Sequence, residues 1–229
     1  MLYHAYEMTH AALSPLRTMA QFSRDAMRSD TNPLADFYGM RVSAAACDMF
    51  INATRRYDKP EFGIKTTEID GTEVAIVEEY VLNLPFCNLL HFKRDSKLGA
   101  DHPKVLIVAP MSGHYATLLR GTVTSMLPDH DVYITDWVDA RDVPAGDAHF
   151  DLDDYVDYLI EMCQVLGADG ERPAVMAVCQ PGVPMLVAAA LMAERNDPCR
   201  PASITLMGSP IDTACNPKAP NELATKNPL

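Results

Sequence analysis

The sequence predicts an α/β fold: a mostly parallel sheet with flanking helices, and antiparallel strands and helices at its N-terminus. From Lys104 onward, short apolar runs alternate with helical stretches, which is the pattern of repeated β-α-β units. Upstream, Asp70-Gly71 separates two β-rich runs and is typical of a hairpin turn. Before these runs, residues 1–57 have apolar side chains at helical spacing.

Composition supports one sizeable soluble domain. The 229 residues suffice to bury a real core, and 48% apolar with 22% charged residues is ordinary for a globular protein. The net charge of −12 opposes binding to phosphate backbones, so no nucleic-acid partner is expected. No basic cluster points to an anionic membrane surface.

The expected cellular location and the expected state of the cysteines depend on sequence signals that the chain lacks. Residues 1–20 are interrupted by Glu7 and Arg17 and contain no signal-peptide core, and no apolar run is long enough for a transmembrane helix. We therefore expect a cytoplasmic protein. The six cysteines are scattered without a C-x-x-C pair, so we expect no disulfide framework, no metal site and no cofactor.

The N-terminal segment, residues 1–60, contains two apolar stripes on either side of Asn32-Pro33. Two interpretations remain open for them. The favoured one is a pair of helices that pack on the main domain, because apolar stripes at helical spacing usually face a core. The other is contact with a membrane or a storage granule.

Residues 61–229 contain the remaining predicted elements in order. The antiparallel start comprises residues 64–69 and 73–82 around the hairpin turn, with residues 86–92 expected to join them. The parallel strands are residues 105–109, 132–135, 174–178 and 203–207, and the helices between them are residues 117–126, 153–166 and 183–195. Residues 105–109 form a continuous apolar run, which predicts a strand buried on both faces. The tail from Asp212 has three prolines and is expected to be irregular.

The strongest chemical signal is Cys179, which stands between the strand at 174–178 and the helix at 183–195. A nucleophile elbow places its reactive atom in this strand–turn–helix setting, where the helix N-terminus favours a thiolate. The backbone N–H of Gln180 would then bind the oxyanion of a tetrahedral intermediate. The motif departs from G-x-S-x-G: cysteine replaces serine, Ala177 replaces the first glycine, and the second falls one place late, at Gly182. The alternative is a buried structural cysteine.

A second oxyanion donor is expected from the loop after the strand at 105–109, where Met111 occupies the donor position. In the same loop, Ser112 and His114 are candidate substrate-site residues or loop-capping groups. Asp136 and Trp137 end another parallel strand at this edge and are further candidates for the substrate site. The favoured interpretation of this pair is structural, with Trp137 in the core and Asp136 capping a turn.

Three segments together resemble intracellular polyhydroxyalkanoate (polyhydroxybutyrate) depolymerases: residues 178–184 (Val-Cys-Gln-Pro-Gly-Val-Pro), 109–114 (Ala-Pro-Met-Ser-Gly-His) and 134–137 (Ile-Thr-Asp-Trp). The resemblance covers essentially the whole chain. It implies an α/β-hydrolase fold, a cysteine nucleophile at Cys179, and hydrolysis or thiolysis of a stored polyester at a granule surface. Polyester synthases are similar in the cysteine elbow and the Asp-Trp pair.

The resemblance also implies an Asp and a His further along the chain, and no histidine follows Cys179; the last is His149. We therefore expect residues 61–229 to be an incomplete α/β-hydrolase domain that does not cleave esters at an enzymatic rate by itself. Two alternatives remain. One is acyl transfer to a hydroxyl acceptor or to coenzyme A, and the other is a non-catalytic granule-associated protein.

Overall fold

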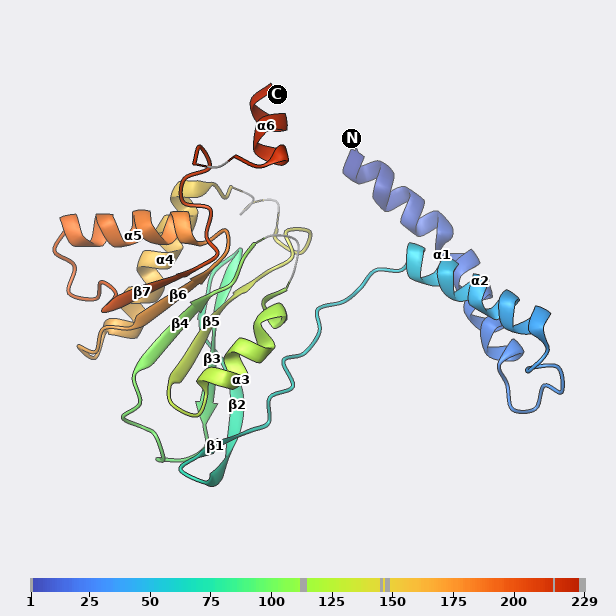
Figure 1. The fold of residues 1–229 in the computed structure, drawn as a ribbon, viewed down its shortest axis with the longest axis horizontal. Helices are drawn as coiled ribbons and strands as arrows, with labels where there is room; N and C mark the ends of the chain where they lie inside the picture. The colour runs from blue at the N-terminus through green and yellow to red at the C-terminus, as the bar shows by residue number, and fades with distance from the viewer. Residues whose placement is uncertain (1, 112–114, 145, 147–148, 216, 227–229) are drawn as a thin grey trace. The chain divides into compact units, whose positions relative to one another are not determined.

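A computed structural model of the protein describes residues 2–111, 115–144, 146, 149–215 and 217–226 (Figure 1). The chain divides into two compact units, Met1–Asp58 and Lys59–Leu229. In chain order the elements are α1 (Leu2–Met27), α2 (Tyr38–Thr54), β1 (Thr66–Ile69), β2 (Thr72–Asn83), β3 (Cys87–Arg94), β4 (Lys104–Val108), η1 (Ala116–Leu119), α3 (Arg120–Met126), β5 (Asp131–Trp137), α4 (Leu152–Gly167), β6 (Ala174–Val178), α5 (Gly182–Glu194), β7 (Ser203–Met207) and α6 (Ala219–Lys226).

The first unit is a pair of packed helices, α1 and α2. Buried Arg17 on α1 donates to the Thr54 carbonyl at the end of α2, and its Nη1 lies 2.9 Å from His10 Nε2. Asn32 shapes the turn between the helices, since its side-chain oxygen accepts from the Leu34 N–H at 3.0 Å. None of the described helices combines the length and hydropathy needed to cross a bilayer.

The second unit is built on a seven-stranded sheet in the order β1-β2-β3-β5-β4-β6-β7. The contacts β1–β2, β2–β3 and β3–β5 are antiparallel, and those among β5, β4, β6 and β7 are parallel. In the parallel part, Ile107 of β4 lies between Ile134 of β5 and Met176 of β6. This mostly parallel sheet with an antiparallel start confirms the predicted α/β-hydrolase-type fold class.

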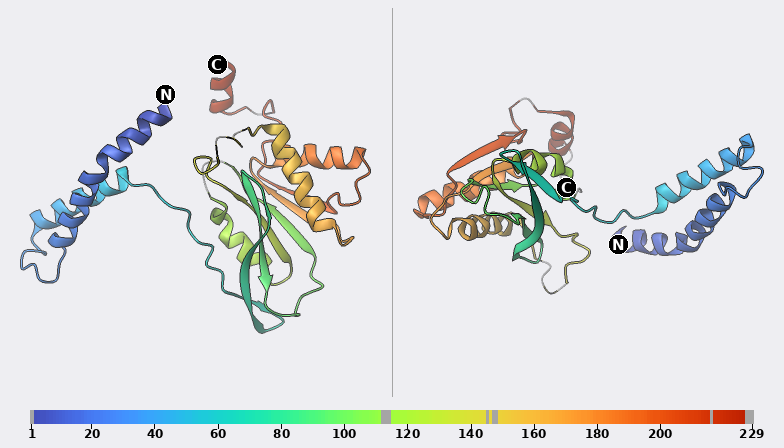
Figure 2. Two further views of the ribbon diagram at one scale, coloured as in Figure 1. Left: turned by 180° about the vertical axis from the view of Figure 1, so that it is seen from behind. Right: turned by 90° about the horizontal axis from the view of Figure 1, so that it is seen from below.

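The helices lie on both faces of the sheet because its parallel connections run in opposite directions (Figure 2). The connection from β4 through α3 moves one way along the sheet, and those through α4 and α5 move the other way. Right-handed crossovers in opposite directions place their helices on opposite faces. Thus α3 covers one face, while α4 and α5 pack together on the other. All three helices begin at the carboxyl edge of the parallel strands.

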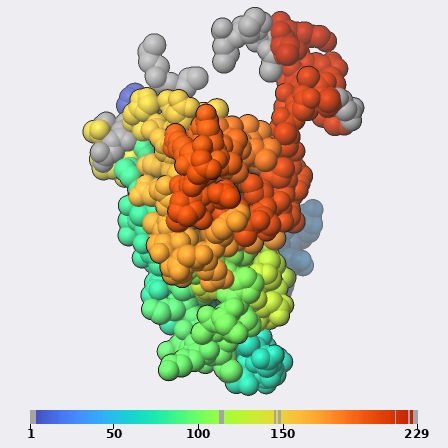
Figure 3. Space-filling view, turned by 90° about the vertical axis from the view of Figure 1, so that its left-hand side faces the viewer, coloured from blue at the N-terminus to red at the C-terminus, as the bar shows by residue number. Residues whose placement is uncertain are grey.

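Burial follows position in the sheet. Leu106, Ile107 and Val108 of central β4 are fully buried, as the continuous apolar run predicts. By contrast β7 is largely exposed, and Leu206 and Met207 keep 38% and 44% of their surface. The outer surface of α5, in orange in Figure 3, also faces solvent. The core therefore centres on β4, β5 and β6.

The tail differs from the sequence expectation, because α6 forms where an irregular segment was expected. Two local features explain it. The Lys218 N–H donates to Asn221 Oδ1 at 3.0 Å at the helix start, and Pro220 falls in the first turn, where a missing N–H costs nothing. Glu222 and Lys226, one turn apart, then form an ion pair at 3.5 Å. The three prolines of the tail are the reason that the sequence predicted an irregular segment instead of this short helix.

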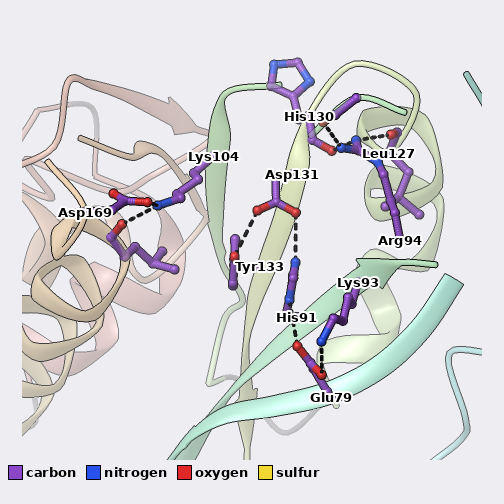
Figure 4. A network of polar contacts seen from close by, with 12 residues as sticks. Glu79, His91, Lys93, Arg94, Lys104, Leu127, His130, Asp131, Tyr133 and Asp169 are labelled. Atoms are coloured by element: carbon purple, nitrogen blue, oxygen red, sulfur yellow. Dashed lines mark hydrogen bonds and ion pairs between the residues drawn. The ribbon is translucent and has the colours of Figure 1, made fainter. Parts of the chain in front are cut away.

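A polar network joins β2, β3 and β5 at the amino edge of the parallel strands (Figure 4). The His91 ring lies between two carboxylates, with Nε2 2.8 Å from Asp131 Oδ1 and Nδ1 3.3 Å from Glu79 Oε1. Tyr133 stacks on His91 at 4.2 Å and donates to Asp131 Oδ2 at 2.9 Å. Lys93 donates to Glu79 Oε2 at 3.1 Å. These contacts hold the antiparallel strands to the parallel part.

This network predicts loss of stability in acid. Burial opposes ionisation of Asp131, yet the hydrogen bond and charge of His91, with the Tyr133 hydrogen bond, hold its pKa below the ordinary value. The Lys93 hydrogen bond lowers the pKa of Glu79. A carboxyl whose folded pKa is lowered stabilises the fold above its unfolded pKa of about 4 and loses this contribution as pH falls further. We expect the free energy of unfolding, measured by denaturant titration, to fall below pH ~4.

The variant Asp131→Asn tests the origin of this acid sensitivity. It should be less stable than the wild type at pH 6, and the difference should shrink toward pH 3 as the wild-type carboxyl takes up a proton. A difference that stays constant between the two pH values would show that Asp131 ionisation does not stabilise the fold.

Candidate active site

Cys179 occupies a strained turn between β6 and α5. Its φ is +66°, in the left-handed region that disfavours residues with a Cβ. The other described non-glycine residues with positive φ are Asp70 and Asn196, whose short polar side chains tolerate this conformation better. The turn is tight, because Cys179 N donates to Met207 O at 2.8 Å and Gly182 N donates to Cys179 O at 3.2 Å. It leaves Cys179 exposed, and a strained turn between a strand and a helix is the backbone setting that nucleophile elbows use.

The displaced glycine of the motif has a packing reason. A Cβ on Gly182 would lie 2.3 Å from both the Cβ and the Oγ of Ser209, in the segment after β7. Ala177, which replaces the first glycine of the usual motif, is fully buried, and Ser209 Oγ lies 3.5 Å from its carbonyl oxygen. The absence of a side chain at 182 therefore lets the segment after β7 approach the turn at Cys179.

The two predicted oxyanion residues are brought together. The Met111 N–H donates to the side-chain Oε1 of Gln180 at 3.0 Å, so the loop after β4 contacts the elbow directly. Among the described residues, no acceptor takes the backbone N–H of Gln180. The other two candidates in the loop, Ser112 and His114, lie outside the described residues.

Trp137 lies in the core. It is 6% exposed, and its ring packs edge-on against Tyr155 at 4.7 Å and Phe150 at 5.9 Å. Its Nε1–H donates to the Ala109 carbonyl at 2.9 Å, while the Ala109 N–H donates to Thr135 Oγ1 at 2.8 Å. Trp137 thus fixes the residue from which the Met111 loop departs, and its place at the substrate site stays a prediction.

Asp136 is also buried, at 1% exposure, and its described side-chain contacts are with other side chains and not with the backbone of a turn. Its Oδ2 accepts from the Tyr80 hydroxyl at 2.7 Å and forms an ion pair with Lys59. Burial opposes the charge of Lys59, but its hydrogen bond to Asp136 and the carboxylate charge raise the lysine pKa overall. Oδ1 has no hydrogen-bond partner among the described residues. These contacts hold Lys59, the first residue of the second unit, against the end of β5.

No described hydrogen bond or ion pair joins the Cys179 thiol to a histidine or a carboxylate. The last histidine, His149, lies before α4, with Nδ1 3.0 Å from Asp154 Oδ2 and Nε2 3.7 Å from Asp151 Oδ2. The spacing of Asp151 and Asp154 is the sequence signal of this cluster, since both carboxylates close a capping box at the start of α4. Ligand atoms of the three side chains lie within 4.8 Å of one another. Helix capping explains why the two carboxylates are close, and His149 contacts them from the preceding segment.

The cysteines differ in exposure, and this predicts selective alkylation at Cys179. Burial raises the pKa of Cys87 well above its ordinary value and that of Cys163 to about 12. Cys215 is exposed, but its hydrogen bond to the Asp212 carboxylate raises its pKa. We expect iodoacetamide at neutral pH to label Cys179 first, as measured by peptide mass mapping. Faster labelling of Cys215 would contradict this expectation, and the unfolded protein, in which all six thiols should react, is the control.

Comparisons with known proteins assign no family to this chain. No protein-family model matches the sequence, and no curated protein matches it. Among solved structures, the chain is similar to an esterase from the fungus Rhizomucor miehei, with 12% sequence identity and a TM-score of 0.42. The match covers 82% of this chain and 57% of the esterase chain. The assignment to an α/β-hydrolase-type fold rests on the strand order and on the turn at Cys179.

Proposed function

We propose that this protein is a cysteine-dependent ester hydrolase that acts on poly(3-hydroxyalkanoate) at a granule surface in the cytoplasm. The observation that supports it most is the left-handed backbone at Cys179, which presents an exposed thiol between a buried strand and a helix. Strained backbone of this kind clusters at functional sites.

The chemistry proceeds through a thioester. The Cys179 thiolate attacks the ester carbonyl carbon, a C–S bond forms, and the carbonyl electron pair moves to oxygen. Backbone N–H groups of Gln180 and Met111 stabilise this oxyanion. The intermediate then collapses, the C–O bond to the leaving alcohol breaks, and the alcohol leaves with a proton from a general acid. Water hydrolyses the thioester and releases the acid.

The proposal includes a histidine that takes the thiol proton and returns it to the leaving group. Nothing among the described residues supplies this base by contact with Cys179. Acylation of the thiol by an activated ester does not need the histidine to protonate the leaving group, because nitrophenolate leaves without protonation. This first half-reaction is therefore the one to measure in residues 1–229.

The polyester substrate is supported by the resemblance of the three segments that contain Cys179, Met111 and Trp137. To test it, two p-nitrophenyl esters are compared as acylating agents: that of the 3-hydroxybutyrate dimer and that of butyrate. A site shaped for the polymer should be acylated by the dimer ester at least about tenfold faster, a difference of about 1.4 kcal/mol. Equal rates would contradict the polyester assignment while leaving ester hydrolysis standing.

A further inference from the structure

The Met111 N–H, which the proposed mechanism needs as a free donor, is already hydrogen-bonded to the Gln180 side chain. In the mechanism the Met111 N–H binds the acyl oxygen, yet in the structure it donates to Gln180 Oε1 at 3.0 Å. Both residues are exposed, so this contact lies at the surface that a substrate would reach. The acceptor is itself a carbonyl oxygen, chemically similar to the ester carbonyl.

We infer that the Gln180 carboxamide is a placeholder acceptor in the oxyanion hole, which the acyl oxygen displaces as the tetrahedral intermediate forms. The inference rests on the proposed function of Cys179. It gives Gln180 two roles, one in direct contact with the oxyanion and one in positioning Met111. Its backbone N–H is a donor to the oxyanion, and its side chain holds the second donor, Met111, near the elbow until the oxyanion replaces it.

Such a placeholder distinguishes the transition state from the bound substrate. When the carbonyl of a bound ester replaces the Gln180 carboxamide at the Met111 N–H, one neutral acceptor replaces another. The free energy of substrate binding therefore changes little. A hydrogen bond to a charged oxygen is roughly twice as strong as one to a neutral oxygen, so the oxyanion displaces the carboxamide. An interaction that strengthens only as charge develops accelerates the chemical step rather than tightening substrate binding.

The local geometry allows the exchange without disturbing the elbow. The turn is held by backbone bonds from Cys179 N to Met207 O and from Gly182 N to Cys179 O, and neither involves the Gln180 side chain. An exposed, flexible side chain leaves its acceptor position without opening the core. The backbone N–H of Gln180 thus stays in place while the carboxamide departs.

Two substitutions separate the placeholder from a purely structural contact. In Gln180→Glu the carboxylate accepts the Met111 N–H more strongly and repels the oxyanion. In Gln180→Met the side chain keeps its length but has no strong acceptor. Gln21→Glu, on exposed α1, is the matched control for the added charge. The assay is single-turnover acylation of the full chain by p-nitrophenyl acetate. The release of nitrophenolate gives the rate, and the mass of the peptide containing Cys179 identifies the acylated residue.

Saturation of the rate with ester gives the acylation rate constant and the half-saturation concentration separately. We expect Gln180→Glu to lower the rate constant at least tenfold with half-saturation unchanged. Gln180→Met should lower half-saturation at least twofold, because the Met111 N–H is then open to the neutral ester. Amide hydrogen exchange at Met111 should be faster in Gln180→Met, and Gln21→Glu should match the wild type.

Three results would overturn the inference. An unchanged rate constant in Gln180→Glu would show that the side chain does not compete with the oxyanion. A tenfold slower Gln180→Met with unchanged half-saturation would show that the carboxamide is required throughout the reaction. Equal Met111 exchange in Gln180→Met and the wild type would show that the contact does not form in solution. Absence of any Cys179 acylation in the wild type would instead reject the proposed function, and the inference with it.

Discussion

Replacing Cys179 with alanine should abolish thioester formation at this position and lower nitrophenolate release from an activated ester at least about tenfold. Removing a covalent nucleophile eliminates the path through the acyl-enzyme, and what remains is the slow attack of water and of other thiols. The expected loss is large because no other described cysteine combines exposure with a turn between a parallel strand and a helix. The measurement is single-turnover nitrophenolate release at mildly alkaline pH.

Cys215→Ala is the matched control, since this thiol is also exposed but lies in the tail. Its release rate should stay within about twofold of the wild type, because its thiol is hydrogen-bonded to Asp212 and is the less reactive of the two. Near-normal release in Cys179→Ala, or a large loss in Cys215→Ala, would mean that the turn at Cys179 is a structural feature only.

The second large effect concerns stability. Lys59→Met should lower the free energy of unfolding by about 3 kcal/mol, because it leaves the Asp136 carboxylate buried with only the Tyr80 hydroxyl as partner. Asp136 is 1% exposed while the Lys59 side chain keeps 36% of its surface, so solvent at the lysine reduces this loss only in part. Denaturant titration at pH 7 measures the change as a shift in the midpoint.

A double substitution identifies the cause. Adding Asp136→Asn to Lys59→Met removes the buried charge, so the double variant should be more stable than Lys59→Met alone. Lys93→Met is the control, because the Lys93 and Glu79 side chains keep 56% and 38% of their surface and such exposed pairs contribute under about 1 kcal/mol. If Lys59→Met cost no more than Lys93→Met, the ion pair between Lys59 and buried Asp136 would not stabilise the fold.

Local patterns were enough to predict the main elements of the second unit. The apolar run at β4 predicted a strand buried on both faces, and Asp70-Gly71 predicted the hairpin of β1 and β2. The elbow was predictable because strand, thiol and helix follow one another directly in the chain. Each of these features depends on neighbours in sequence, through side-chain period or turn chemistry.

The contacts that distinguish this site join residues far apart in the chain. Gln180 and Met111 are separated by 69 residues, and Lys59 and Asp136 by 77. No periodicity links such positions, so a single sequence does not show that the Gln180 side chain occupies the Met111 donor. Trp137 is different, because its apolar ring favoured the core, and the structure adds its hydrogen bond to the Ala109 carbonyl.

The central claim is that Cys179 accepts the acyl group of an ester, and mass mapping of the trapped acyl-enzyme tests it most directly. The full chain is incubated with p-nitrophenyl 3-hydroxybutyrate, quenched in acid and digested, and the added mass is located. We predict one 3-hydroxybutyryl group per chain, on the peptide containing Cys179, released by hydroxylamine as expected for a thioester. Acylation spread over lysines and other cysteines, or an unmodified Cys179 peptide, would contradict the claim.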